Sequence, residues 1–297
     1  MNTALVTCPL CGGALRPWFR KQDRTMVRCA SCRFISVTEG LKVNADGISI
    51  YEADENIFLD DVNTDYYLDE SNMMSARAKL DWVHGFVPES ARLLDVGANF
   101  GHFLKAAEGS YKAVGLELSP QAVAFSRANF NVDNRTASLY EPPEDLHGPF
   151  DIVTCWDVIE HVPDAVAAIR NLSQLVRPGG YLFISTPDAQ SLVARITGRY
   201  WHYLDPVQHI SLFGRNNLAK LLETHGLAVE GIRSFGHYYR VRYIAERLLQ
   251  LHGESWLRPA ALGARALLKP FNKRIMFLKL GDVLGIAARK KESGHGG

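Results

Sequence analysis

The sequence predicts an α/β protein with a doubly wound sheet of seven strands, preceded by a small cysteine-rich module. Short apolar runs alternate with stretches of helical spacing from residue 75 onward, and a glycine-rich turn follows the first run. Four of the five cysteines lie within the first 32 residues, which sets that segment apart. A chain of 297 residues with 47% hydrophobic composition can bury such a core.

Two Cys-x-x-Cys pairs occupy the N-terminal module, for which we expect residues 1–45. The pairs Cys8/Cys11 and Cys29/Cys32 have the spacing of a structural zinc ion held by two knuckles. The module has almost no apolar core of its own, so we predict a zinc ribbon that the metal stabilises. Because all four ligands are cysteines, no coordination position is left for chemistry.

Residues 46–75 are acidic and rich in Tyr and Asn, which predicts a linker that runs into a lid-like segment. Tyr66 and Tyr67 have little core to pack against there, so we expect them to contact the cofactor by cation–π interaction. A helix is predicted over 75–87, ending before Pro88. It opens the main domain, expected over 76–297.

The elements beyond Pro88 alternate as in βαβ units, which favours a parallel sheet. Between the last two strands, residues 237–280 combine helical apolar spacing with many basic residues, and we interpret them as an inserted helical cap. For the basic segment 256–291, a face that binds a membrane or an acidic partner stays open, although a cap helix with solvated lysines is the commoner case. Strands are predicted at 92–96, 113–117, 132–137, 150–156, 180–186, 227–235 and 283–288, and helices at 100–109, 119–129, 163–176 and 215–225.

A strand runs directly into a glycine-rich turn at Asp95-Val96-Gly97-Ala98-Asn99-Phe100-Gly101. The two glycines permit close approach of a ligand to the backbone, and Asn99 is the residue type that best tolerates positive φ after glycine. The spacing Gly-x-x-x-Gly differs from the Gly-x-Gly-x-x-Gly of dinucleotide sites, and Asp95 would repel a pyrophosphate. The same carboxylate suits the ammonium group of an amino-acid-like ligand.

The next strand ends in a second acid, Glu117, followed by Leu118. At that place two ribose hydroxyls can donate to the carboxylate oxygens. The two acids together therefore fit a ligand in which adenosine is joined to an amino acid.

This arrangement resembles class I S-adenosylmethionine-dependent methyltransferases, which have a Rossmann-like fold. The segments 150–164 and 176–187 look like further blocks of that family, in the same order. The run Trp201-His202-Tyr203 … His209 … Phe213 and the N-terminal cysteines are similar to methyltransferases related to ubiquinone-biosynthesis O-methyltransferases. The resemblance implies S-adenosylmethionine as cofactor and a hydroxyl of a small molecule as acceptor, such as a sugar, a quinol precursor or a natural-product intermediate. It implies cofactor contacts at Asp95, Gly97, Ala98, Asn99, Gly101, Glu117, Leu118, Trp156 and Asp157.

Methyl transfer from a sulfonium depends mainly on positioning, but a hydroxyl acceptor must also lose its proton. His161 and His209 follow two predicted strands at the carboxyl edge of the sheet, so both are candidate bases. Alternatively, Asp157, Glu160, His161 and His209 together form a site for a hard divalent metal ion. Trp156 is expected either to line the sulfonium or to pack in the core.

Composition limits the other function classes. The net charge is +1, so the whole chain has no strong field for nucleic acid, although RNA methylation guided by the basic ribbon stays open. No secretory leader and no run of roughly 20 apolar residues is visible, so we expect a cytoplasmic protein without a transmembrane segment. The glycine spacing and the lack of Tyr-x-x-x-Lys disfavour a dehydrogenase, and the intact acids disfavour a non-catalytic adaptor. Oligomeric state is left open.

Overall fold

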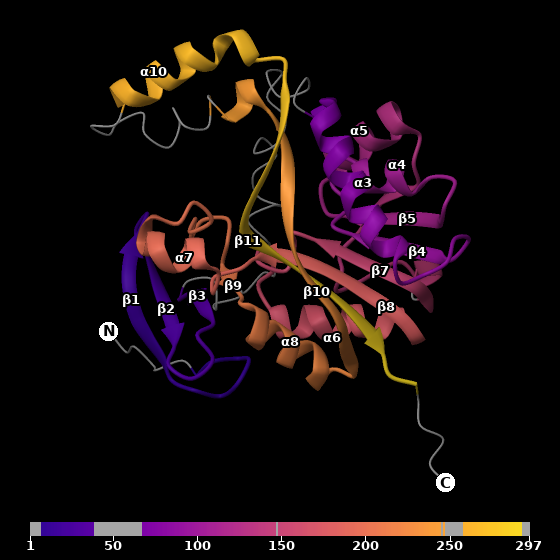
Figure 1. The fold of residues 1–297 in the computed structure, drawn as a ribbon. Coiled ribbons are helices and arrows are strands. Elements are labelled where there is room, and N and C mark those ends of the chain that lie inside the picture. The colour runs from indigo at the N-terminus through magenta and orange to yellow at the C-terminus, as the bar shows by residue number, and fades with distance from the viewer. Residues whose placement is uncertain (1–6, 39–66, 147, 245, 247–257, 293–297) are drawn as a thin grey trace.

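The computed structural model describes residues 7–38, 67–146, 148–244, 246 and 258–292 (Figure 1). Its main sheet has the strand order β10-β11-β8-β7-β4-β5-β6, and only β11 runs against its neighbours. This confirms the predicted seven-stranded, mostly parallel sheet. The strands are β4 (Arg92–Val96), β5 (Lys112–Glu117), β6 (Asn134–Thr136), β7 (Phe150–Trp156), β8 (Val176–Pro187), β10 (Leu227–Arg240) and β11 (Ile275–Lys290).

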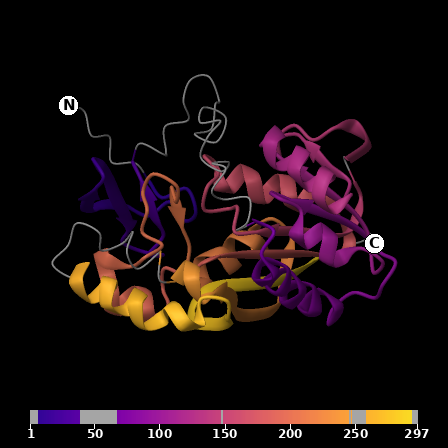
Figure 2. The ribbon, with the colours of Figure 1, turned by 90° about the horizontal axis from the view of Figure 1, so that it is seen from above.

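Helices cover both faces of the sheet, as a doubly wound fold requires (Figures 1 and 2). On one face, Ile152 and Trp156 of β7 join the core formed with α3 and α4, whereas Val153 and Cys155 join the core formed with α6 and α8. The strand therefore follows the period of two that buries it on both sides. The helices are α3 (Glu70–His84), α4 (His102–Ala107), α5 (Pro120–Phe130), α6 (Ala165–Leu175), α7 (Leu192–Thr197), α8 (Arg215–Thr224) and α10 (Arg258–Leu268), with 3-10 turns η1 (Glu144–Leu146), η2 (Gly198–Tyr200) and η3 (Lys269–Phe271).

The expected linker over 46–75 differs from the structure at its end. Helix α3 begins at Glu70, where the Asp69 side chain accepts a hydrogen bond from the Ser71 N–H and caps the helix. Residues 70–75 therefore belong to the first helix of the main domain. Most of the expected linker, including Tyr66, lies outside the described residues.

The cysteine-rich module forms a sheet that borrows a strand from the main domain. Its strands β1 (Leu15–Lys21), β2 (Arg24–Cys29) and β3 (Ile35–Val37) are completed by β9 (Ser211–Leu212), which follows β8 in the chain. Met26 and Val37 share a buried cluster with Trp201 and Leu212 of that segment. The module thus gains the apolar core that it lacks by itself.

The predicted helical cap over 237–280 is wrong at both of its ends. Strands β10 and β11 stay paired from His237↔Leu278 to Arg240↔Ile275, so the chain leaves and re-enters the sheet as one long β-ribbon. The ribbon projects beyond the sheet and carries α10 near its far end (Figure 1). Aromatic and β-branched residues such as Tyr238, Ile275 and Phe277 favour the strand. Among the described residues, no helix is long and apolar enough to cross a membrane.

Candidate active site

The glycine-rich turn has the backbone that the sequence predicts. Gly97 has φ +74°, and a Cβ there would lie 2.2 Å from Cγ2 of Val158. Asn99 adopts φ +47°, so the asparagine occupies a left-handed position as expected. Gly101 has φ +81° and lies against Ser126 of α5, where a Cβ would approach to 2.7 Å. Gly97 therefore allows the turn to pack closely against Val158, while Gly101 allows two helices to pack.

Asp95 is buried at the carboxyl end of β4. Its Oδ1 accepts a hydrogen bond of 2.6 Å from the Thr154 hydroxyl on the neighbouring strand β7. Burial raises the pKa of Asp95 to about 7, although the hydrogen bond and the Lys79 ammonium both favour the charged form. A cationic ligand group at this place would favour the ionised carboxylate and so oppose the effect of burial.

Glu117 lies at the end of the adjacent strand β5. Its Oε2 accepts from the N–H of Asn99 at 2.8 Å, and its Oε1 accepts from the N–H of Ser119 at 2.9 Å. Burial raises the pKa of Glu117, and these N–H groups oppose the shift. Because each carboxylate oxygen has a second lone pair, Glu117 can still accept hydrogen bonds from a ligand.

Two adjoining cavities lie along this edge of the sheet. A cavity of about 450 Å³ contains Glu117 and Leu118, and a cavity of about 420 Å³ contains Asp95 and Ala98. Each acid thus lines a different cavity. The residues that line both are Gly97, Asn99, Trp156, Asp157, His161 and His209.

Asp157 is held by groups that the sequence did not reveal as partners. Lys79 of α3 donates to its Oδ2 at 2.9 Å, and the Ser185 hydroxyl of β8 donates to its Oδ1 at 2.7 Å. Burial would raise the pKa of Asp157, but the charges of Lys79 and His237 and these hydrogen bonds outweigh it and hold the pKa below its usual value. The Asp157 carboxylate therefore has partners within the protein on both of its oxygens.

Glu160, His161 and His209 form a compact cluster, with one ligand atom from each within 4.8 Å of the others. His161 donates through Nδ1 to the Gln208 carbonyl at 2.8 Å, and His209 donates through Nδ1 to the Tyr203 carbonyl at 2.7 Å. These bonds place the lone pair of each neutral ring on Nε2. Asp157 was expected as a fourth metal ligand, but it pairs with Lys79 and is not part of this cluster.

The titration of this cluster is set mainly by burial. Burial raises the pKa of Glu160 to about 8, with a further increase from Asp157, and Glu160 Oε2 is a buried atom with no hydrogen-bond partner. Burial lowers the pKa of both His161 and His209. The charge of the nearby His161 lowers the pKa of His209 further. Both imidazoles are thus neutral near pH 7, the form that accepts a proton or binds a metal ion.

The two aromatic residues expected at the cofactor differ in their placement. Trp156 packs edge-on against Phe103 and Phe235 and also lines both cavities, so it serves the core and the site together. Tyr67 stacks on Phe100 with ring centroids 3.8 Å apart. Tyr67 thus packs against a residue of the glycine-rich turn, and it is not among the described residues that line either cavity.

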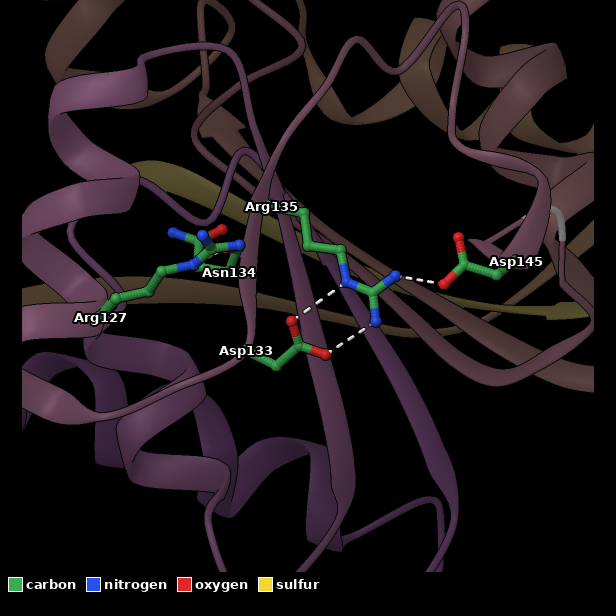
Figure 3. A network of polar contacts seen from close by, with 5 residues as sticks. All are labelled: Arg127, Asp133, Asn134, Arg135 and Asp145. Carbon is green, nitrogen blue, oxygen red and sulfur yellow. Dashed lines mark hydrogen bonds and ion pairs between the residues drawn. The ribbon is translucent and has the colours of Figure 1, made fainter.

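An ion-pair network connects β6 to η1 (Figure 3). Arg135 on β6 bonds both oxygens of Asp133 and also reaches Asp145 in η1. The segment between β6 and η1 supplies Ser138 to Tyr140 to the cavity wall. Nearby, buried Asn134 donates to the Asn99 carbonyl at 3.0 Å and so holds the glycine-rich turn. Sequence analysis missed Asn134 because nothing in a three-residue strand marks it.

The four cysteines of the ribbon converge as their spacing predicts. Their sulfur atoms all lie within 4.8 Å of one another, with Cys8–Cys32 at 3.6 Å and Cys11–Cys29 at 3.5 Å. The Cys32 N–H donates to the Cys29 sulfur, as expected for a knuckle. Two hydrogen bonds connect the cysteine-rich module to the main domain. Asn217 of α8 donates to the Cys32 carbonyl, and the Val37 N–H donates to the carbonyl of Ile210, the residue after His209.

A doubly wound sheet with an acid and a glycine-rich turn after one strand and a second acid after the next defines a nucleoside-binding α/β protein. Residues 71–231, more than half of the chain, match a family model described as a methyltransferase domain. The chain therefore belongs to the methyltransferase domain family, as the sequence predicted.

Curated relatives point in the same direction. A ubiquinone biosynthesis O-methyltransferase of Xanthomonas campestris pv. campestris is 37% identical over 115 residues, which cover 36% of this chain and 48% of that protein. Its namesake in Xanthomonas axonopodis pv. citri is 32% identical over 168 residues, covering 50% of this chain and 70% of the relative. The chain thus spans about half the length of the first of these relatives.

Solved structures share the fold at low identity. Phosphoethanolamine N-methyltransferase 2 of Haemonchus contortus, in complex with S-adenosyl-L-methionine, has a TM-score of 0.55 at 16% identity and covers 82% of this chain and 60% of its own. This likeness concerns the fold alone.

Proposed function

We propose that this chain transfers a methyl group from S-adenosylmethionine to a hydroxyl group of a small molecule. The observation that carries the proposal is the pair of adjoining cavities, with Glu117 in one, Asp95 in the other and two histidines where they meet. One cofactor spans both: its ribose binds Glu117 in the larger cavity, and its ammonium binds Asp95 in the smaller one. The sulfonium then lies beside their common wall.

The rest of the smaller cavity is the proposed acceptor site. Its wall includes Tyr203, Tyr238 and Tyr239 beside Trp156, which favours a flat aromatic acceptor over a sugar. His161 and His209 lie at the junction of the cavities, where the acceptor oxygen must meet the methyl group. The curated relatives carry the name of O-methyltransferases, which supports oxygen as the methylated atom. We therefore assign a hydroxyl on an aromatic ring as the acceptor class.

We further propose that Glu160, His161 and His209 hold a divalent cation at this junction. The unpartnered buried oxygen of Glu160 supports this, because a metal ion would satisfy it. Both histidines also present Nε2 while Nδ1 is fixed by a backbone carbonyl, the usual orientation of metal-bound imidazole. Such an ion supplies Lewis acidity, which lowers the pKa of a hydroxyl bound to it.

We also propose that the ribbon holds zinc. A tetrahedral zinc ion with Zn–S bonds of about 2.3 Å separates its sulfurs by about 3.8 Å. The Cys8–Cys32 and Cys11–Cys29 sulfur–sulfur distances, 3.6 and 3.5 Å, are close to this value. The ion is structural, because four thiolates leave no position open.

The methyl-transfer proposal is tested with methyl-labelled S-adenosylmethionine and separate pools of phenols, sugars and RNA. We expect label in the phenol pool for the wild-type protein and at most a hundredth of that rate for Asp95→Ala. Glu108→Ala, an exposed acid on α4's C-terminal side, is the matched control and should keep full rate. Label in the RNA pool alone, or none in any pool for protein that binds the cofactor, would refute the proposed acceptor.

The cation is tested by titrating Mn²⁺ into the protein and into Glu160→Gln, followed by electron paramagnetic resonance. We expect the variant to lose at least tenfold in Mn²⁺ affinity while its affinity for S-adenosylmethionine stays within about threefold. If wild-type protein binds no Mn²⁺ at millimolar concentration, or if chelators leave methyl transfer unchanged, one of the two histidines acts as a base without a metal.

A further inference from the structure

Exposed apolar side chains gather on one projecting part of the molecule. We call this part the arm: residues 237–240 of β10 together with residues 258–281, which hold helix α10, η3 and the first part of β11 (Figure 1). Six of the fourteen large apolar residues that are exposed within the described part of the chain lie on the arm, so the clustering is not an average surface property. They are Leu262 (46% exposed), Leu267 (77%), Phe271 (46%), Met276 (45%), Phe277 (51%) and Leu280 (57%).

The same surface is strongly basic. Between residues 258 and 281 the sequence has no Asp or Glu, although the whole chain has a net charge of only +1. The next acid, Asp282, is buried and accepts a hydrogen bond from the Trp201 indole N–H. The exposed basic side chains of the arm are Arg265, Lys269, Lys273, Arg274 and Lys279.

Basic and apolar groups are interleaved on the arm rather than separated. The Arg274 guanidinium lies over the Phe271 ring, 5.4 Å from its centroid. Arg265 lies in the last turn of α10, between the exposed Leu262 and Leu267, and Lys269 follows at the start of η3. Long basic side chains can then direct their charges toward phosphates while their stems and the apolar neighbours contact hydrocarbon.

We propose that the arm docks on an anionic lipid surface. The boundary between headgroups and acyl chains offers both of the complements that the arm requires, namely negative phosphates and hydrocarbon. RNA would pair with the cations but leave leucines such as Leu267 in water. A second copy of the arm would bring like charges together, since no acid on the arm faces them.

Docking would hold the proposed acceptor cavity close to the lipid. His237, Tyr238 and Tyr239 of the arm line that cavity. Tyr238 on β10 is paired with the exposed Phe277 on β11. The inference rests on exposure and charge alone, so it stands or falls independently of methyl transfer.

The test is sedimentation of the full, zinc-loaded protein with vesicles of phosphatidylcholine, with and without one third phosphatidylglycerol. We expect binding to the anionic vesicles only. Each removed charge should weaken binding about fivefold, since one basic residue near an anionic surface contributes about 1 kcal/mol. Lys269→Gln/Lys273→Gln should therefore lose at least tenfold, and Leu267→Ser/Leu280→Ser should lose a similar factor.

Lys112→Gln/Lys220→Gln is the matched control, because it removes the same charge from exposed positions away from the arm. It should bind vesicles within twofold of wild type. Calorimetric affinity for S-adenosylmethionine should be unchanged in all variants, which separates a lipid defect from a damaged site. Equal losses in control and arm variants would overturn the proposal, as would equal binding to neutral vesicles. Light scattering could also overturn the proposal. It would do so if the wild type and the control were dimers and only the arm variants were monomers.

Discussion

The two halves of the proposed site are built in different ways. In the cofactor half, Asp95 and Glu117 lie at the tips of adjacent parallel strands, and the turn between them depends on positive φ at Gly97 and Asn99. In the acceptor half, side chains arrive from α3, the loop before β9 and the arm. They are joined by contacts across long sequence separations, such as Lys79 with Asp157.

This difference predicts different responses to substitution. The cofactor half is fixed by backbone geometry, which no rotamer change can relax. The acceptor half is fixed by charge pairs and by the loop before β9. That loop is held because β9 pairs with β3 of the cysteine-rich module. Changes in the first half should therefore abolish cofactor binding, whereas changes in the second should weaken turnover by degrees.

The largest effect is expected for Gly97→Ala. The new Cβ would meet Val158 at 2.2 Å on a residue with φ +74°, so affinity for S-adenosylmethionine should fall at least a hundredfold by calorimetry. Val158→Ala in the same chain should restore part of it, because it removes the contact but leaves the φ strain. Gly263→Ala on α10, where a Cβ has open space, should change nothing. Unchanged affinity in Gly97→Ala would show that the backbone of this turn does not determine cofactor binding.

Loss of the proposed zinc ion should act on the acceptor half. With Cys29→Ser, the ribbon should no longer hold β9 and the neighbouring His209, so turnover should fall by tenfold or more. Cofactor affinity should stay within about threefold. Zinc content by mass spectrometry and steady-state rates check this, and equal damage to cofactor affinity would argue that the two halves are not separately supported.

Lys79→Met should have a moderate effect on stability. Removing one partner of a buried pair costs about 3–5 kcal/mol, but Asp157 is 33% exposed, so about 1–2 kcal/mol is expected here. Urea unfolding measures it, and Lys79→Met/Asp157→Asn should cost less than the sum of the single changes. Exposed Lys112→Met is the control. Strict additivity would mean that the pair contributes nothing.

The smallest effect is the pH dependence of cofactor binding. Burial raises the pKa of Asp95 to about 7, and an ammonium group binds only its ionised form, so affinity should rise severalfold from pH 6 to pH 8. The free protein should show the opposite trend. Its unfolded state releases the Asp95 proton near pH 4, so this group's contribution to stability falls as pH rises from about 4 to 7. Asp95→Asn should flatten both curves, and a persistent slope would assign them to other groups such as Glu160.

The parts that the sequence predicted are those encoded locally. Seven strands, the positive φ of Asn99 and the meeting of four cysteines all follow from period or spacing within a short segment. Lys79, Asn134 and β9 were missed because their partners lie far along the chain, and no local pattern marks such pairs. In the arm, helical apolar spacing outweighed the β propensity of Tyr238 and Phe277, and the pairing of these two residues across 39 positions decided for the strand.

The most direct test of the account compares two ligands in two variants by calorimetry. S-adenosylmethionine has both an adenosyl and an amino-acid part, whereas 5′-methylthioadenosine lacks the amino acid. Asp95→Asn should weaken S-adenosylmethionine at least tenfold and leave 5′-methylthioadenosine unchanged, while Glu117→Gln should weaken both. If Asp95→Asn weakened both ligands equally, or Glu117→Gln neither, the two acids would not hold opposite ends of one cofactor.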